Sequence, residues 1–307
     1  MRVCEVTGFG GPEVLRPSER PWPVAATTEV VVRIRAANVN PTDLSARSGA
    51  ARRRMADLQP PFVLGWDLAG VVTSVGAEVS GYAVGDPVVG MIPWIRTGGR
   101  VGAYAQAAAV DPSWLAPLPD GLDEVTAATV PLNALTARQA LDLIAAPAGA
   151  TVLVTGASGA VGGFATQLAT RDGLRVVAIA SAGDEDWVGG LGAAEVHPRG
   201  TDLAALGPVD ALVDAVPIGR AAALAVRDGG VAVFTRSVDA GASGRELRVE
   251  TPLVHSDPGA LAELTRQVAG GALRTRVART LDLGQAAEAH RLGEHGGLRG
   301  KVVLTTS

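Results

Sequence analysis

A glycine-rich segment near the middle of the chain carries the clearest chemical signal in the sequence. In TVLVTGASGAVGGFATQLA, an apolar run leads into Gly156, Gly159 and Gly162 and then into residues with the spacing of an amphipathic helix. Glycines let the backbone turn tightly and approach a pyrophosphate, and the first amides of the helix supply hydrogen-bond donors for its charge. A turn that needs positive φ is the ordinary alternative. Because strand, glycines, helix and a second strand follow in order, we predict a dinucleotide-binding site.

The end of the next apolar run bears on which dinucleotide would bind. The run RVVAIAS ends in Ser181, where NAD-selective proteins carry an acidic residue that binds the ribose hydroxyls. A serine would accept a 2′-phosphate without charge repulsion, which favours NADPH, with NADH as the alternative. Against this preference, Asp184, Glu185 and Asp186 follow closely, and a serine that simply ends a strand explains the residue equally well.

The elements around the glycine loop predict an α/β fold. Continuous apolar runs typical of buried parallel strands occur at 151–155, 175–180, 211–216 and 231–234. They alternate with helix-like segments and short glycine-rich links. This repetition predicts a doubly wound parallel sheet, the Rossmann arrangement.

The first third of the chain has a different pattern. Residues 29–40 alternate between apolar and charged side chains, as a half-buried strand does. Glycine and proline turns separate further short apolar segments at 67–76, 85–91 and 102–110. We predict a compact antiparallel β unit here, to which the apolar segment at the end of the chain, KVVLT, would return.

Length and composition narrow the possible functions. A chain of 307 residues exceeds the size at which one hydrophobic core keeps growing. We therefore expect one domain of residues 1–122 and 270–307 and a second of residues 123–269. The net charge of −4 gives no attraction for nucleic acid, and no apolar run reaches the length of a membrane span or a signal-peptide core. A cytoplasmic protein with neither nucleic-acid nor membrane partners is expected.

Metal ligands are scarce. Cys4 is the one cysteine, and the four histidines (His197, His255, His290 and His295) show no HExxH spacing. His290 and His295 fall in a polar segment, so we expect them to be solvated. Cys4 is expected to be a small buried hydrophobe. No metal site is predicted.

Several spaced motifs together resemble one family. These are NVNPTD (38–43), PFVLGWDLAGVVTSVG (61–76), LNALTARQAL, the glycine loop, LGAAEV (191–196) and RGKVVL, in a familiar order over nearly the whole chain. The chain resembles the zinc-independent quinone oxidoreductase, or zeta-crystallin-like, branch of the medium-chain dehydrogenase/reductases. The resemblance implies a GroES-like β catalytic domain, a Rossmann domain inserted in it, a cleft between them, and a homodimer joined through Rossmann edge strands.

The resemblance also implies roles for particular residues. Asn40 and Asp43 of NVNPTD would line the cleft near the nicotinamide, and Lys301 of RGKVVL would approach the cofactor from the terminal segment. Other implied cofactor contacts are Thr136 of NALTARQAL, Ser158, Gly159, Ala160 and Val161 around the pyrophosphate, and Phe234 and Thr235 beside the nicotinamide ribose. Arg199 falls where related sequences often carry a tyrosine near the adenosine phosphate, and it would replace the missing basic partner of Ser181.

Several positions depart from the family pattern. Zinc-containing relatives have Gly-His-Glu before AGVV, whereas this chain has Gly65, Trp66 and Asp67, which removes an imidazole ligand and disfavours zinc catalysis. Ala160 replaces the second glycine of the usual pair and adds a methyl group near the phosphates. Asp184 aligns with a frequent lysine, which weakens the argument for NADPH. A tyrosine that many relatives carry after NVN is absent.

The chemistry that best fits these residues is hydride transfer to the electrophilic carbon of a small-molecule enone or quinone. The proton that completes the reduction would come from solvent or from Tyr104, although a buried tyrosine with a satisfied hydroxyl is the more ordinary role. Ile92 and Trp94 would wall an aromatic substrate pocket, and packing is an equal alternative for Trp94.

Two other functions fit the same fold. One is a biosynthetic enoyl or alkene reductase without quinone activity, which a panel of enones and quinones would distinguish. The other is a cofactor-binding protein that has lost turnover, as Ala160 and the missing tyrosine suggest. A non-redox enzyme on this scaffold is a third alternative, because a fold does not fix a function.

Overall fold

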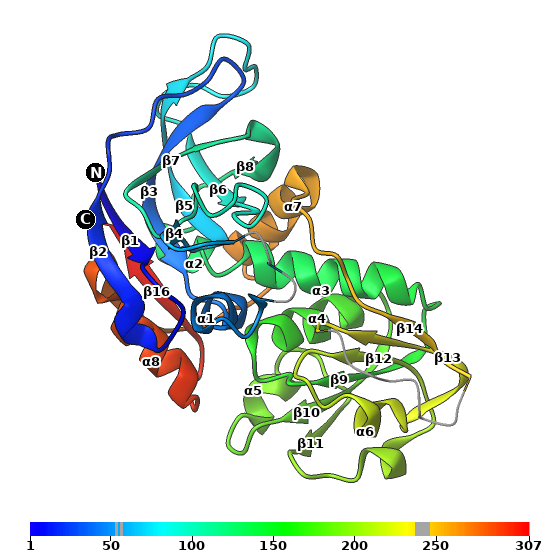
Figure 1. The fold of residues 1–307 in the computed structure, drawn as a ribbon. Coiled ribbons are helices and arrows are strands. Elements are labelled where there is room, and N and C mark those ends of the chain that lie inside the picture. The colour runs from blue at the N-terminus through cyan, green and yellow to red at the C-terminus, as the bar shows by residue number, and fades with distance from the viewer. Residues whose placement is uncertain (53–54, 56–57, 237–245, 307) are drawn as a thin grey trace. The chain divides into compact units, whose positions relative to one another are not determined.

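The protein is described by a computed structural model that covers residues 1–52, 55, 58–236 and 246–306. The chain divides into two compact units (Figure 1). Unit 1 comprises Met1–Leu132, His255–Ala272 and Arg276–Ser307, and unit 2 comprises Asn133–Val254 and Leu273–Thr275.

Unit 1 is built on two β-sheets. Its strands are β1 (Arg2–Val6), β2 (Leu15–Glu19), β3 (Val30–Asn38), β4 (Phe62–Val63), β5 (Asp67–Val75), β6 (Pro87–Met91), β7 (Ala107–Val110), β8 (Leu115–Pro117), β15 (Val277–Asp282) and β16 (Lys301–Thr305). Three of them form an antiparallel sheet in the order β2-β1-β4, and seven form a second sheet in the order β15-β16-β3-β5-β6-β8, with β7 also paired to β3. The expected antiparallel β unit is confirmed.

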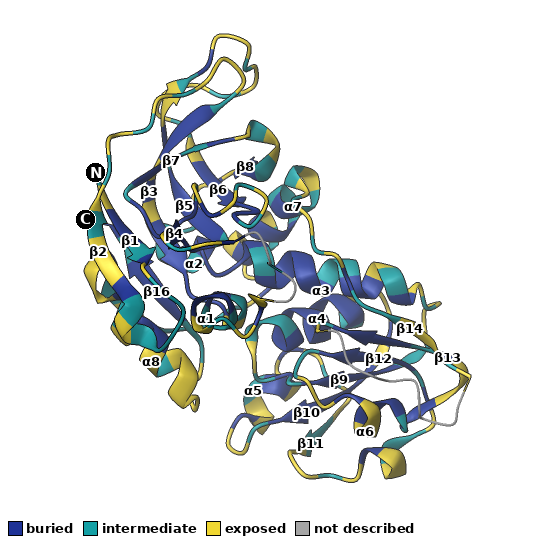
Figure 2. Ribbon diagram, in the orientation of Figure 1, coloured by how far each residue is buried: buried dark blue, intermediate teal, exposed yellow. Residues whose placement is uncertain are grey.

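Strand β3 shows why the sequence folds in this way. Val30, Val32 and Ile34 are buried, while Arg33 and Arg35, which alternate with them along the strand, are exposed, so one face of this part of the strand packs on the core. Figure 2 shows the sheet of unit 1 as mostly buried ribbon. Strand β16 pairs antiparallel with β3, so the terminal segment returns to this unit as the sequence predicts.

The helices of unit 1 are α1 (Pro41–Ser48), α2 (Glu124–Ala127), α7 (Pro258–Ala269) and α8 (Ala286–His295), with short 3-10 turns η1 (Pro12–Val14), η3 (Pro112–Trp114) and η5 (Leu283–Gln285). From its sequence position, α7 was expected in the Rossmann domain. Instead it groups with unit 1 and packs near β8, burying Leu261, Leu264 and Val268. An amphipathic pattern fixes which face of a helix is buried, and leaves open which sheet covers it.

Unit 2 has one parallel sheet. Its strands are β9 (Thr151–Thr155), β10 (Arg175–Ala180), β11 (Glu195–Pro198), β12 (Val209–Asp214), β13 (Val226–Phe234) and β14 (Arg248–Glu250), and its helices are α4 (Ala160–Arg171), α5 (Glu185–Gly189), α6 (Arg220–Ala223) and η4 (Leu203–Leu206). Helix α3 (Pro131–Ile144) begins at the boundary of the two units. The strand order is β11-β10-β9-β12-β13-β14, and all pairs are parallel.

This order confirms the doubly wound sheet. The chain builds outward from β9 through β10 to β11 and then crosses to β12 on the other side of β9. In such sheets the ligand crevice lies outside the carboxyl ends of the strands, where the direction of winding changes. The residues that follow β9 and β12 therefore mark the place to look for a site. Within the described residues, no helix is both long and apolar enough to cross a membrane.

Candidate functional site

The glycine loop follows β9 and leads directly into α4. Gly156 has a φ of +64°, and a Cβ at this position would lie 2.6 Å from Val216 Cγ1. A Cβ at Gly162 would overlap the carbonyl oxygen of Gly156, because the first turn of α4 packs against the loop. At Gly159, the residue before α4, a Cβ would come within 3.2 Å of the same oxygen. Gly159 and Gly162 thus allow a close backbone approach, which leaves the positive end of a 12-residue helix beside the loop.

The loop is tied to the end of β10. Ser181 donates its backbone N–H to Ser158 Oγ at 2.8 Å, so the two sequence-predicted serines lie in contact. Ala160 and Val161, the first residues of α4, are half-buried. Asp184 is buried at the start of α5.

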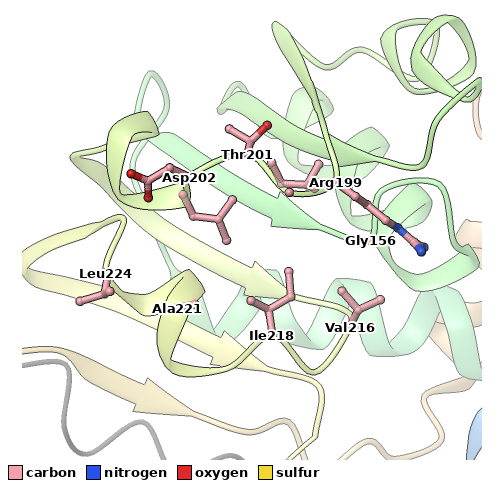
Figure 3. A pocket seen from close by; sticks show the side chains of 11 residues that line it. Gly156, Arg199, Thr201, Asp202, Val216, Ile218, Ala221 and Leu224 are labelled. Atoms are coloured by element: carbon pink, nitrogen blue, oxygen red, sulfur yellow. The ribbon is translucent and has the colours of Figure 1, made fainter.

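A cavity of about 600 Å³ opens beside this loop within unit 2. Its lining residues are Gly156, Ile179, Arg199, Gly200, Thr201, Asp202, Leu203, Val216, Ile218, Ala221 and Leu224. Figure 3 shows the apolar side chains of Val216, Ile218 and Leu224 on one side and the polar residues Arg199, Thr201 and Asp202 on the other, with Arg199 extending toward Gly156. The cavity falls in the size range of small-ligand sites, and its apolar walls suit the flat faces of a purine.

A buried carboxylate supports one wall of this cavity. Asp214, at the end of β12, accepts hydrogen bonds from the hydroxyl of Thr155 and from the N–H of Gly219, the latter at 2.8 Å. Burial raises the pKa of Asp214. Thr235 donates both its N–H and its hydroxyl to the Asp214 carbonyl oxygen at 3.1 Å. These contacts hold the loops after β9, β12 and β13 together.

The other sequence-predicted cofactor contacts of unit 2 lie at element ends. Phe234 ends β13, and its side chain is 1% exposed and belongs to the core cluster of the sheet. A ligand at the end of this strand would therefore contact the Phe234 backbone and not its ring. Thr136 is largely buried on α3.

Unit 1 contains a second candidate, a buried polar cluster at the ends of β3, β5 and β16. We call it the Asp67 cluster, and it comprises Asn38, Asn40, Asp43, Asp67 and Lys301. Asp67 accepts hydrogen bonds from the Leu132 N–H at 2.7 Å, from Asn40 Nδ2 at 2.7 Å and from Asn38 Nδ2 at 3.0 Å. Lys301 Nζ donates to Asn40 Oδ1 at 2.9 Å. The cluster brings together three of the sequence-predicted residues, Asn40, Asp43 and Lys301.

Asp43 links this cluster to α1. Its carboxylate accepts the Asn40 N–H at 2.9 Å and the Gly65 N–H at 3.3 Å, so it caps the start of the helix. Burial raises the pKa of Asp43 to about 7, although the hydrogen bond from the Asn40 amide acts in the opposite direction. Burial also raises the pKa of Asp67 and lowers that of Lys301 to about 8.

Tyr104 and His290 form a separate buried pair. The Tyr104 hydroxyl lies 3.1 Å from His290 Nε2, and neither residue is exposed. Burial raises the pKa of Tyr104 well above its usual range and lowers the pKa of His290 to about 3. The sequence-based expectation that His290 is solvated is wrong, because α8 turns His290 toward the core while His295 stays exposed. The Tyr104 hydroxyl therefore has a hydrogen-bond partner, as expected for a buried tyrosine with a structural role and not for a proton donor.

The aromatic residues near β6 serve packing. Ile92 and Trp94 are fully buried in the core cluster of unit 1. The Trp94 ring stacks on Phe62 at a centroid distance of 5.9 Å and meets Trp66 edge-on at 6.0 Å. Neither residue lines the cavity of unit 2. Cys4 is also buried, as expected, and burial raises the pKa of its thiol to about 12.

The described residues include no cluster of metal-ligating side chains. No group of three or more His, Cys, Asp or Glu side chains in that part of the chain is arranged to hold an ion. Trp66, which replaces the histidine of the zinc-containing pattern, packs against Trp94.

Within the Asp67 cluster, the sequence-based predictions do not include Asp67 itself as a site residue. It lies at the start of an apolar run, and the signal that could have found it is that a carboxylate in a buried strand must find partners. Lys301, which the resemblance does include, is the only lysine in the chain among 27 lysines and arginines.

Comparison with known proteins places the chain in a family. Residues 26–120 match the alcohol dehydrogenase GroES-like domain, and residues 191–304 match a family described as zinc-binding dehydrogenase. The quinone oxidoreductase of Mus musculus is 38% identical over 188 residues, which are 61% of this chain and 54% of that protein. The 2-methylene-furan-3-one reductase of Solanum lycopersicum is 32% identical over 246 residues, 78% of this chain and 63% of that protein. The matches thus span little more than half the length of these relatives.

A solved structure extends the likeness to the whole chain. The quinone oxidoreductase from Coxiella burnetii superposes with a TM-score of 0.90 and 27% sequence identity, covering 100% of this chain and 99% of that one. The antiparallel β unit is therefore GroES-like, and the parallel sheet is of the Rossmann type. The chain belongs to the medium-chain dehydrogenase/reductases, an oxidoreductase family, in the branch of the quinone oxidoreductases.

Proposed function

We propose that the protein is an NADPH-dependent oxidoreductase that passes hydride to a quinone or an α,β-unsaturated carbonyl compound without zinc. The observation that carries the proposal is the 600 Å³ cavity of unit 2, which continues from the glycine loop and includes an arginine in its lining. A quinone oxidoreductase and an enone reductase are among the relatives. Both types of acceptor share a carbonyl group conjugated with a carbon–carbon double bond.

The residues present fit a dinucleotide. The glycine loop and the start of α4 would hold the pyrophosphate, and Ile218 and Leu224 would pack against the adenine. When bound, the dihydronicotinamide supplies a hydride. The chain contributes the glycine loop, the helix terminus and the apolar cavity walls that would orient the dinucleotide on unit 2.

The preference for NADPH rests on Arg199. Its side chain reaches from the cavity lining toward Gly156, on the same edge as Ser181, so it would supply the positive charge that a 2′-phosphate needs. Asp184 does not argue against this, because it is buried at the start of α5.

Replacing Arg199 with methionine is expected to raise the Kd for NADPH roughly tenfold and to leave the Kd for NADH within about twofold. Arg199 is exposed, so solvent screening limits the effect. Fluorescence titration with each dinucleotide measures it. Arg220→Met is the matched control, because Arg220 is an exposed arginine of unit 2 outside the cavity lining. Equal weakening of both dinucleotides would contradict the assignment.

Zinc independence is proposed from the donor set. The position of the catalytic imidazole in the zinc-containing pattern is Trp66, whose indole packs in the core. The description of the second matched family as zinc-binding is a property of that family, and the described residues of this chain hold no group of ligands suited to the ion.

The proposed function is tested by anaerobic titration with NADPH and NADH, followed by absorbance at the dihydronicotinamide band as quinones and enones are added. We expect selective binding of NADPH and its oxidation by at least one acceptor class, at a rate that EDTA does not lower. Oxidation by enones alone would favour a biosynthetic enoyl reductase, in keeping with the tomato relative. Tight binding without oxidation would mean a cofactor-binding protein without turnover, and failure to bind either dinucleotide would refute the proposal.

A homodimer is proposed as the assembly. Strand β14 is an edge strand of the Rossmann sheet, and Val249 on it and Leu253 beyond it are 43% and 91% exposed. Pairing of this edge with a second copy would cover both side chains, and sedimentation analysis distinguishes the dimer from the monomer.

A further inference from the structure

Unit 1 contains a cavity that the proposed function does not use. It has a volume of about 200 Å³ and lies between residues 20–23, residues 100–102 and strand β7. Its charged side chains are Arg20 and Arg100, and within the described residues no acidic side chain lines it. Valines, alanines and prolines form most of the remaining lining. The cavity therefore combines apolar walls with positive charge.

The cavity lies along an open edge of β7. This strand pairs with β3 on one side (Figure 1). Chain segment β1 covers the other edge as far as Gln106, whose N–H donates to the Arg2 carbonyl oxygen at 3.0 Å, and no described strand continues this pairing beyond it. The next residues, Ala107, Ala108 and Ala109, all line the cavity. Because consecutive residues of a strand point to opposite faces, a cavity that contacts three in a row lies beside the edge of the strand and not over one face.

The opposite wall of the cavity cannot complete the sheet. Pro21 and Pro23 line it, and neither has a backbone N–H to donate to β7. The residues that alternate with these prolines, Trp22 and Val24, are 55% and 86% exposed. Large apolar side chains next to an open strand edge offer contacts to a chain that adds a strand there.

Two arginines give the cavity its charge. Arg20 Nε donates to Glu5 at 2.6 Å, and Arg20 Nη1 donates to the Arg100 carbonyl oxygen at 3.0 Å, so the Arg20 guanidinium is fixed. The Arg100 side chain is exposed and forms no ion pair in the described part of the chain. Because Glu5 offsets the charge of Arg20, Arg100 leaves this region with a net positive charge. A carboxylate complements such a pair of guanidinium groups.

We propose that this cavity binds the C-terminal segment of a partner protein, in extended conformation, as a strand added to the edge of β7. The backbone of the partner would pair with Ala107–Ala109, and its terminal carboxylate would contact Arg100 and Arg20. Strand β7 has only four residues, so it pairs with a short segment. A chain end supplies both a short segment and a free carboxylate. Every residue that carries this inference belongs to unit 1, and it stands independently of the proposed function.

Fluorescence polarisation tests the charge contact. The probe is the peptide Thr-Val-Thr-Val-Leu, labelled with fluorescein at its N-terminus and ending in a free carboxylate. We expect it to bind saturably, and the same peptide with a C-terminal amide to bind about tenfold more weakly, because it loses charge-assisted hydrogen bonds. Arg100→Met should weaken the acid about fivefold and leave the amide within about twofold, since solvent screens an exposed cation. Arg96→Met, at an exposed arginine that does not line the cavity, is the control and should bind as the wild type.

Two further peptides test strand addition. They carry N-methyl groups on alternate residues, one peptide for each register, because alternate N–H groups of a strand point to the same neighbour. We expect one of them to bind about tenfold more weakly than the unmethylated acid and the other to bind within about threefold of it. Hydrogen exchange in wild-type peptides that contain β7 should slow when the probe binds.

Three results would overturn the proposal. Main-chain pairing and the carboxylate contact do not depend on the side chains of the probe, so the absence of saturable binding up to about 1 mM would refute it. Equal binding of the acid and the amide would remove the charge contact. Acetyl-leucine that binds as tightly as the peptide would show a site for small carboxylates in place of a docking surface.

Discussion

Replacing Gly162 with alanine is expected to weaken NADPH binding about 100-fold and to lower the free energy of unfolding of unit 2 by about 2–3 kcal/mol. The added Cβ would overlap the carbonyl oxygen of Gly156, and the neighbouring Ala157 amide lies 2.9 Å from the same point. Both obstacles are backbone atoms, so no side-chain rotation relieves them. The glycine loop must move away from α4, and the amides that would face the pyrophosphate move with it.

The adjacent glycine supplies a matched control. A Cβ at Gly163 would lie 3.4 Å from the Ala157 oxygen and 3.5 Å from Leu191 Cδ1, which are ordinary contacts. Gly163→Ala adds the same methyl group to the same helix without a close contact, so it should bind NADPH within about threefold of the wild type. Its stability should not fall, because alanine has a higher helix propensity than glycine. Isothermal titration calorimetry and denaturant unfolding measure both effects. Equal behaviour of the two variants would show that the close approach at Gly162 is not required.

The parallel sheet was the most predictable part of the fold. Its strands are continuous apolar runs, and the expected segments 151–155 and 175–180 agree with β9 and β10 residue for residue. The run expected at 211–216 forms β12 two residues earlier, at Val209–Asp214. Val216 instead follows the strand and lines the cavity. Apolar character marks both a buried strand and an apolar cavity wall, so it does not locate the boundary between them.

Local sequence patterns did not predict contacts between segments that are distant in the sequence. Tyr104 and His290 are 186 positions apart, and nothing near either residue indicates the other. The polar composition of α8 predicted a solvated helix, yet one histidine on it is fully buried because α1 and β16 pack against that face. Periodicity predicts that a helix has a buried face. It does not predict the polar partner that a buried histidine needs, because tertiary structure determines that partner.

The part of the candidate site that depends on backbone geometry was predictable from the sequence. The glycine loop needs small residues for steric reasons, so its sequence is readable without knowledge of the fold. The assignment of Arg199 came from the resemblance alone, and the structure places this residue in the lining of the unit 2 cavity. The Asp67 cluster was not assembled from sequence, because its members come from three strands and the start of a helix and share no spacing.

Replacing Asp67 with alanine is expected to cost unit 1 about 3–5 kcal/mol of unfolding free energy, the range for removing one partner of a buried charged network. The change removes an acceptor shared by three buried donors, Asn38 Nδ2, Asn40 Nδ2 and the Leu132 N–H, of which Asn38 Nδ2 also donates to Asn40 Oδ1 at 3.1 Å. Removing the carboxylate also removes the free-energy cost of burying its charge, which offsets part of this loss. The raised pKa of Asp67 reflects that cost. Three hydrogen bonds of 2.7 to 3.0 Å outweigh it, because no water-exposed alternative is open to donors at this depth.

Hydrogen exchange resolved by mass spectrometry locates this loss. We expect faster exchange in peptides of β3, β5 and β16 and little change in peptides of β9 and β10, because the two groups belong to different compact units. Asp120→Ala, at an exposed aspartate of unit 1, should leave exchange unchanged. Uniform acceleration in both units would contradict a local role for Asp67. Exchange in β16 is the most direct readout, because Lys301 begins that strand and donates to Asn40, whose amide Asp67 holds.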